Sequence, residues 1–294
     1  TQSAAPELLN LGMVTEAQWV DIDKDGTLEL VVVGDWMPLT IFKNINNKFQ
    51  KTTVPNTSGW WNCLRANDID SDGDIDLAAG NMGSNTRMKV SKEKPASLYV
   101  DDFDANGQTE CVPVYYKTDG KAYPAPLKGE LEMQLPFLKK KFLYFSEYAG
   151  RSMEEIFTAE RLTKSTVLKT EMSETAIFIN DGKGQFSVTP LPTMAQLSPV
   201  YGIQIMDFDN DGTKDIFLAG NFYSVKPQFG RFDASYGTML KGLGKNAYRY
   251  IEPAASGMFV NGETRDITTV KTKAGRLVIV AMNNAPLYLF ERNF

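Results

Sequence analysis

The sequence contains no histidine and only two cysteines among its 294 residues. Without histidine there is no imidazole to bind zinc, to act as a general base or to activate a serine or cysteine nucleophile. Two cysteines are too few for a disulfide scaffold. We expect Cys63 and Cys111 to be two buried free thiols, with a bridge between them as the alternative.

Long hydrophobic runs are also missing. No stretch reaches the roughly 18 apolar residues that a membrane-spanning helix needs, so we expect no membrane insertion. No charged and then apolar leader follows Thr1, and we expect a mature protein or a domain cut from a longer one. Basic and aromatic residues do not alternate in a pattern that indicates nucleic-acid binding. The run Lys139–Lys141 could attract acidic partners, but it is more typical of a solvated helix face.

Acidic residues, by contrast, are concentrated in four short segments, although the net charge is only −5. The segments Asp21–Glu29, Asp68–Asp76, Asp102–Glu110 and Asp207–Asp215 share the spacing Asp-x-Asp-x-Asp/Asn-Gly-x-x-Asp/Glu. Oxygen side chains at alternating positions can surround a cation that needs six to eight oxygens, and the glycine permits a sharp turn. Because carboxylate and carbonyl oxygens together favour Ca²⁺ over Mg²⁺, the sequence predicts up to four calcium ions.

The expected ligands are side-chain oxygens at positions 1, 3, 5 and 9 of each segment, with a backbone carbonyl at position 7. They are Asp21, Asp23, Asp25, Thr27 and Glu29; Asp68, Asp70, Asp72, Asp74 and Asp76; Asp102, Asp104, Asn106, Gln108 and Glu110; and Asp207, Asp209, Asp211, Thr213 and Asp215. The alternative is four metal-free turns, since aspartate and glycine are common turn residues. That alternative is strongest at the third segment, where Asn106 replaces an acid.

An EF-hand has the same opening spacing, but it needs a glutamate at position 12 and flanking helices. Position 12 here is Val32, Ala79, Pro113 or Leu218, so the closing ligand is missing each time. The flanking residues are apolar and resemble strands, as in Leu28–Gly34. The acidic segments are therefore predicted to join pairs of strands.

The strands around these segments recur along the chain. Val278–Phe290 repeats the pattern of Val31–Phe42, with Lys271–Gly275 where the acidic segment would be, and Ala176–Phe186 reads as a hairpin. Repeats of ~40–45 residues with four strands indicate the blades of a β-propeller. We expect an all-β fold, one domain over residues 1–294 of about five or six blades. Helical spacing in Pro136–Phe145 and a capping box at Ser152–Glu155 predict a helical insertion near residues 128–162.

These residues resemble the FG-GAP/VCBS repeat family, the calcium-loop propellers of integrin α-subunit heads and many bacterial surface proteins. The resemblance rests on the four loops, on strands ending in Gly34-Asp35, Gly80-Asn81 and Gly220-Asn221, and on the hairpin Asn180–Phe186. Gly59–Trp61 and Lys226–Arg231 are similar to the large VCBS proteins of gut Bacteroidetes. The resemblance implies a ring of seven blades, structural calcium and a ligand bound at one face.

The metal loops should lie on one face and the connections between second and third strands on the other. Those long connections predict a ligand face, because loops on a rigid scaffold commonly carry function. Its expected residues are Asp35, Trp36, Asn81, Arg87, Asn221, Tyr223, Lys226, Arg231 and Asn283, with ordinary packing turns as the alternative. The adjacent Trp60 and Trp61 could stack on a sugar, but a core role is expected.

Two main classes of function compete. The first is a calcium-binding, non-catalytic module that binds a protein or a carbohydrate in a secreted, periplasmic or cell-surface protein, since calcium is abundant outside cells. The second is a polysaccharide lyase or glycosidase that uses paired carboxylates. Most clustered acids belong to the metal loops, while Asp233, Glu252 and Glu263 show no pairing in sequence, so we expect no enzyme. A purely architectural domain is a third alternative, and the oligomeric state is not predicted.

Overall fold

The computed structural model describes residues 5–227, 229–273 and 275–291, which form two compact units. The main unit comprises Thr1–Pro55, Trp60–Arg87 and Ser173–Phe294 as far as they are described, and the inserted unit comprises Asn56–Gly59 and Met88–Met172. The main unit consists mostly of antiparallel β-sheet, and the inserted unit combines a four-stranded antiparallel sheet with short helices, so the expectation is confirmed as a mostly β fold. No helix among the described residues is both long enough and apolar enough to cross a membrane.

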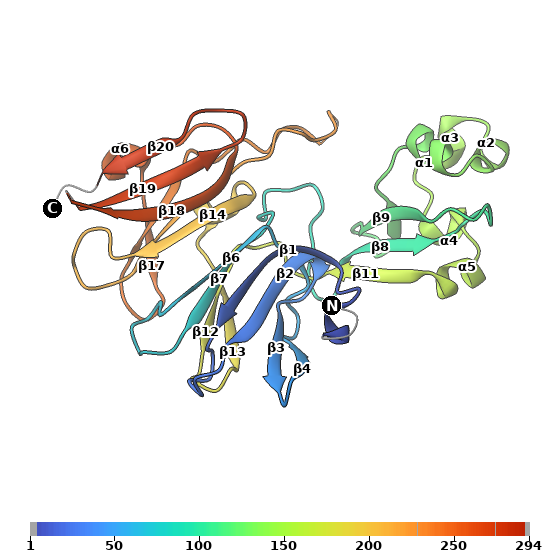
Figure 1. Cartoon of the computed structure of the whole chain (residues 1–294). Coiled ribbons are helices and arrows are strands. Elements are labelled where there is room, and N and C mark those ends of the chain that lie inside the picture. The colour runs from blue at the N-terminus through green and yellow to red at the C-terminus, as the bar shows by residue number, and fades with distance from the viewer. Residues whose placement is uncertain (1–4, 228, 274, 292–294) are drawn as a thin grey trace. The chain divides into compact units, whose positions relative to one another are not determined.

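The main unit contains a succession of antiparallel sheets in chain order, coloured from blue to red in Figure 1. The first consists of β1 (Met13–Val20), β2 (Glu29–Met37), β3 (Thr40–Ile45) and β4 (Lys48–Thr53). The second consists of β6 (Cys63–Asn67), β7 (Asp76–Gly80), β12 (Ala176–Asn180) and β13 (Phe186–Pro190). The third consists of β14 (Val200–Met206), β15 (Asp215–Gly220), β16 (Thr238–Gly242) and β17 (Tyr248–Ile251). The fourth consists of β18 (Thr264–Thr272), β19 (Gly275–Met282) and β20 (Tyr288–Glu291).

Short elements complete the main unit. They are the 3₁₀ turns η1 (Pro6–Leu8) and η2 (Thr193–Gln196) and the helix α6 (Pro253–Ser256). The two-residue strand β5 (Gly59–Trp60) lies where the chain passes between the units. The hairpin predicted over Ala176–Phe186 is confirmed by β12 and β13, whose turn includes two glycines with positive φ, Gly182 and Gly184.

The sheets pack face to face, which explains why their second strands are mostly apolar. Every residue of β7 and of β15 is buried, and Val31, Val32 and Val33 of β2 are at most 1% exposed. A strand covered on both faces reads as a continuous apolar run, whereas a half-exposed strand alternates. One core cluster joins Ala78 and Ile177 of the second sheet to Ile203 and Leu218 of the third. Trp61 is fully buried and Trp60 is 6% exposed, which confirms their core role.

The first strands of neighbouring sheets lie beside one another, β1 beside β6, β6 beside β14 and β14 beside β18. Side chains join them: Gln18 on β1 donates to the carbonyl of Leu64 (2.8 Å) and accepts from the N–H of Ala66 (3.0 Å) on β6. Arg65 on β6 forms ion pairs with Glu16 on β1 and with Asp266 on β18. These polar contacts connect the sheets through their first strands.

The inserted unit interrupts the second sheet between β7 and β12. Its strands are β8 (Ala96–Asp101), β9 (Glu110–Tyr116), β10 (Ala122–Pro124) and β11 (Thr166–Thr170), paired in the order β10-β9-β8-β11. Its helices are α1 (Lys128–Gln134), α2 (Leu138–Lys141), α3 (Phe145–Tyr148), α4 (Met153–Ile156) and α5 (Ala159–Lys164). The helices expected near residues 128–162 are therefore present, but the segment that separates the two halves of the second sheet also carries a sheet of its own.

One predicted helix differs from the structure. Pro136–Phe145 forms two separate turns, because Phe142 after α2 is extended (φ −129°, ψ 97°) and Phe145 begins α3. The capping box at Ser152 is confirmed, since the Glu155 carboxylate accepts from the Ser152 N–H at 2.8 Å. Leu138, Met153 and Ile156 pack into one core with Val112 and Val114 of β9. Packing against the sheet therefore favours two short helical turns over one continuous helix.

Candidate metal centres

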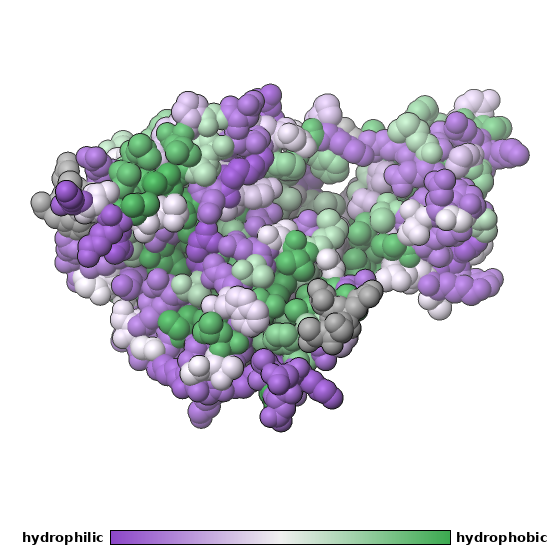
Figure 2. Space-filling model, in the orientation of Figure 1, coloured by the Kyte–Doolittle hydropathy of each residue, from purple (hydrophilic) through white to green (hydrophobic). Residues whose placement is uncertain are grey.

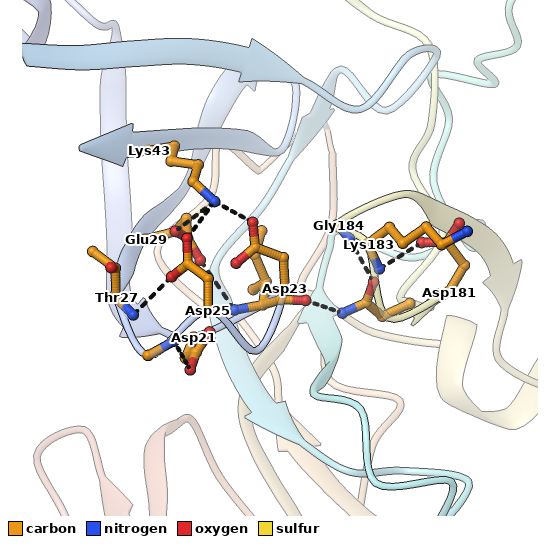
Figure 3. Close-up of polar contacts among 12 residues, drawn as sticks. Asp21, Asp23, Asp25, Thr27, Glu29, Lys43, Asp181, Lys183 and Gly184 are labelled. Atoms are coloured by element: carbon orange, nitrogen blue, oxygen red, sulfur yellow. Dashed lines mark hydrogen bonds and ion pairs between the residues drawn. The ribbon is translucent and has the colours of Figure 1, made fainter. Parts of the chain in front are cut away.

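The first acidic segment joins β1 to β2 and gathers its carboxylates on one side of a tight loop (Figure 3). Oxygens of Asp21, Asp23 and Glu29 lie within 4.8 Å of one another. The same positions 1, 3 and 9 come together in the other three segments. Those clusters are Asp68, Asp70 and Asp76; Asp102, Asp104 and Glu110; and Asp207, Asp209 and Asp215.

The loops share one backbone conformation. The first-position carboxylate accepts a hydrogen bond from the sixth-position glycine, for example from Gly26 to Asp21 at 3.1 Å and from Gly212 to Asp207 at 3.0 Å. That glycine has φ between 83° and 91° in all four loops. The fourth-position residues also have positive φ, from 57° to 65°. They are Lys24, Ser71, Ala105 and Asn210.

The ninth-position carboxylate is the most buried group in each loop. Glu29, Asp76 and Asp215 are at most 2% exposed, and Glu110 is 6% exposed. One oxygen of each accepts from the second-position N–H. The donors are Ile22 (3.1 Å), Ile69 (2.9 Å), Phe103 (2.9 Å) and Phe208 (2.8 Å). Burial raises the pKa of all four ninth-position groups, that of Asp76 to about 6.

Several oxygens in these clusters are buried without a hydrogen-bond partner among the described residues. They are Asp21 Oδ1, Asp23 Oδ1, Glu29 Oε1, Asp68 Oδ1, Asp70 Oδ1 and Asp104 Oδ1. A buried unpaired carboxylate oxygen is costly, and neighbouring like charges increase that cost unless a cation neutralises them. Hard oxygen donors in this number are what Ca²⁺ takes as ligands. The loops therefore fit a divalent cation.

The fifth-position side chains, predicted as ligands, also support the turn. The side chains of Asp25, Asp72, Asn106 and Asp211 accept from the N–H of the seventh residue at 2.7–2.9 Å. They support the turn and are not among the clustered carboxylates. The seventh-position carbonyls of Thr27, Asp74, Gln108 and Thr213 stay predictions as ligands.

Two lysines beside the loops were not found from the sequence. Lys43 on β3 pairs with Asp23 and lies 2.8 Å from Asp25 (Figure 3), and Lys241 on β16 pairs with Asp209 and lies 2.8 Å from Asp211. These contacts raise the pKa of both lysines and lower that of Asp25 and Asp211. Each lysine follows two apolar residues of a third strand, in Ile41–Lys43 and in Met239–Lys241. This shared position is the sequence feature that could have identified the two lysines.

The three loops of the main unit lie at the same end of their sheets. Lys24 of the first loop pairs with Asp74 of the second. Asn180, the last residue of β12, donates to the carbonyls of Ile22 (2.6 Å) and Ile75 (3.1 Å) in those two loops. A 90 Å³ pocket lies between the second and fourth loops, with Asp70 and Thr213 in its wall.

The residues expected on the ligand face separate into two groups. Asn81 and Asn221 are at most 1% exposed, and their side chains bond backbone groups such as the N–H of Trp60 (3.2 Å) and of Ser235 (3.0 Å). Their buried turn-supporting role corrects the expectation that they face a ligand. The remaining expected members are exposed or partly exposed. They are Asp35, Trp36, Arg87, Tyr223, Lys226, Arg231 and Asn283.

Some of these exposed or partly exposed residues contact one another or a shared neighbour. Arg231 lies over the Tyr223 ring at 5.3 Å, and Glu263 accepts from the Tyr223 N–H and from Asn283, both at 2.8 Å. Glu263 also lies 3.6 Å from Arg265. Trp36 has φ 60°, which is unusual for a bulky residue, and meets Trp60 edge-on at 5.3 Å. Glu263, unpaired in the sequence analysis, is thus a partner of this group.

Residues 21–79 match the family model of the FG-GAP-like repeat. The match begins at the first acidic loop and ends in β7, after the second loop. The third and fourth loops repeat the geometry of this FG-GAP-like repeat, including the glycine conformation and the bond to the ninth-position carboxylate. A search of curated proteins found no match.

The cysteines are both free, Cys63 buried and Cys111 exposed. The expectation of free thiols is confirmed, and the expectation that both are buried is wrong for Cys111. Burial raises the pKa of Cys63 to about 12, so its thiol stays protonated near neutral pH.

Proposed function

We propose that this chain is a calcium-binding β-propeller module that binds a protein or carbohydrate ligand without catalysing a reaction. The observation that carries this proposal is the repeated cluster of buried carboxylate oxygens without hydrogen-bond partners. Calcium would be held by positions 1, 3 and 9 of each loop and would neutralise charge between paired strands. Its role is structural, because each loop ties the end of one strand to the start of the next.

The propeller architecture is supported by the way in which the main unit's sheets adjoin. Sheets whose first strands lie side by side and whose faces pack together are typical of blades around an axis. The ion pairs of Arg65 with Glu16 and Asp266 join three of these first strands. The FG-GAP-like repeat in residues 21–79 supports the same architecture.

The proposed ligand face is the end opposite the loops, around Trp36, Tyr223 and Arg231. Aromatic and arginine side chains are frequent at the centres of binding surfaces. The positive φ of Trp36 supports a functional position, since strained backbone gathers at such sites. The variants Trp36→Ala and Arg231→Ala are expected to lose binding on a glycan array or in a protein-interaction screen, and unchanged binding by both would remove this face.

A secreted or cell-surface location follows from the calcium proposal. Sites of modest affinity fill where free calcium is in the millimolar range, as it is outside cells. We also propose that the protein is not an enzyme, because Glu263 is engaged by Tyr223 and Asn283 instead of facing a second carboxylate. An activity screen on acidic and neutral polysaccharides that detected turnover would contradict this part of the proposal.

The experiment for calcium binding compares thermal unfolding in calcium and in EGTA. Calcium at about 100 times its Kd should stabilise the folded state by about 2.7 kcal/mol per site. The Tm should therefore fall clearly in EGTA and return when calcium is added. The matched variant Asp21→Asn/Asp23→Asn should lose part of this response, whereas Asp119→Asn, outside the loops, should keep it. Equal Tm values in calcium and EGTA would overturn the proposal.

A further inference from the structure

The fourth sheet repeats the others but replaces the acidic loop with a basic hairpin. The pairing of β1 with β2, of β14 with β15 and of β18 with β19 is shifted by a bulge near the start of the first strand. In the fourth sheet the strands continue until Thr272 pairs with Gly275. Lys271 and Lys273 therefore occupy the place that aspartates occupy in the other sheets.

A pocket of about 520 Å³ adjoins this hairpin, at the loop end of the main unit. Four basic side chains line it, and we call it the basic pocket. They are Lys214, Lys271, Lys273 and Arg276. Lys214 comes from the fourth acidic loop and the other three from β18, β19 and their turn, so two adjacent sheets contribute.

None of these four cations has an ion-pair or hydrogen-bond partner for its side chain among the described residues. Other lysines at the loop end are paired: Lys24 with Asp74, Lys43 with Asp23 and Lys241 with Asp209. Four like charges around one pocket repel one another, and an anionic ligand removes that repulsion. The contrast with the paired lysines indicates that these charges are available to a ligand.

Among the described residues that line the pocket, the only acid is Asp207, the first-position residue of the fourth loop. A cation held by that loop would take up its charge, leaving the pocket strongly positive. The lining otherwise consists of Met206, Thr272 and Gly275. Since none of the described lining residues is aromatic, they offer no ring on which nucleic-acid bases could stack.

We infer that the basic pocket binds an acidic oligosaccharide, through sulfate or carboxylate groups on its sugars. The volume lies in the range of ligand pockets and exceeds the needs of one small oxyanion. Arginine binds such groups through two parallel hydrogen bonds, and lysines act as point charges around them. The inference goes beyond the proposed function, because it concerns a different site and does not depend on the ligand face.

The test measures binding of fluorescent oligosaccharides to the full chain in calcium. One arm uses a sulfated oligosaccharide, another an oligogalacturonate, and a third a neutral oligosaccharide of the same length. Binding is expected in the charged arms and should weaken as salt rises from about 50 to about 200 mM. The variant Lys271→Glu/Arg276→Glu should weaken it at least about tenfold, as expected when two ion pairs become repulsive contacts.

The control is Lys48→Glu/Lys51→Glu on β4, which changes the net charge equally on exposed residues of the first sheet. It should keep the affinity of the wild type. If the first variant folds poorly, Lys271→Gln/Lys273→Gln replaces it.

A preference for sulfate or for uronate would identify the source of the charge. Equal loss in the control, equal binding by the neutral sugar, or tighter binding of a DNA oligomer of equal charge would overturn the inference. The calcium dependence of Tm, measured on the same samples, reports separately on the proposed function.

Discussion

At the scale of single residues, the ninth-position carboxylate shows how each loop combines folding with metal binding. One of its oxygens bonds the second-position N–H, which closes the loop, while its burial makes the ionised form unfavourable without a cation. Asp76 is the clearest case, since it is fully buried and its pKa is raised to about 6. An ordinary aspartate has a pKa near 3.9.

This shift predicts how pH affects the calcium-free protein. Because the folded state holds the Asp76 proton more tightly than the unfolded state, stability should increase as pH falls from 7 through about 6. The Tm in EGTA should thus rise on the order of a few °C between pH 7 and pH 5. Asp76→Asn should reduce this dependence. A Tm in EGTA that falls steadily over that range would contradict the assignment.

Lys43 provides a second prediction at this scale. Its ammonium group lies between Asp23 and Asp25 and would repel a divalent cation held by the same carboxylates. Lys43→Gln is therefore expected to raise the calcium affinity of the first loop by about three- to tenfold. It should also make the protein less stable in EGTA. Isothermal titration calorimetry tests the affinity and thermal unfolding in EGTA tests the stability, each alongside Lys48→Gln, which should behave as the wild type. Weaker calcium binding by Lys43→Gln would mean that the lysine supports the site.

At the scale of elements, glycines near the ends of second strands permit the starts of the first strands to lie close to them. A Cβ on Gly34 would lie 2.2 Å from the Met13 carbonyl oxygen, and one on Gly220 would lie 1.6 Å from that of Pro199. Both contacts are with backbone atoms next to the bulge of the first strand, which cannot move as a flexible side chain would. The recurrent glycine is thus required by packing.

Gly220→Ala should consequently destabilise the main unit by about 2–4 kcal/mol, as expected for overpacking against backbone. Denaturant unfolding measures this change. Gly129→Ala in α1 is a useful comparison, because its added Cβ meets no atom within 4 Å and alanine favours a helix. It should be neutral or slightly stabilising. A Gly220→Ala protein as stable as the wild type would show that the bulge adapts.

The acidic loops could be predicted because their ligands lie within nine residues of one another, so spacing alone places them together. The contacts of Lys43 and Lys241 with the loops could not be predicted, since both lysines reach the loops from a third strand. The continuous helix over Pro136–Phe145 was wrong because tertiary packing divides it. Asn81 and Asn221 were misplaced because turn asparagines that face solvent and those that bond buried backbone look the same in sequence.

At the scale of the whole molecule, the second sheet is assembled from segments on either side of the inserted unit. The N–H of Gly83 bonds the Ser173 carbonyl at 2.7 Å, so the two ends of the main chain around the insertion are held close together. Replacing Met88–Met172 by a short flexible linker should leave a folded main unit that binds three calcium ions instead of four. Calorimetric stoichiometry and near-UV circular dichroism test this, and an unfolded product would show that the main unit needs the insertion.

The most direct test of the account is a crystal structure of the full chain grown in calcium, with anomalous scattering recorded. We predict a peak in each loop, with oxygens of the first, third and ninth residues about 2.3–2.6 Å away. Loops that keep their shape but show no peak, with lysines still between the carboxylates, would contradict it.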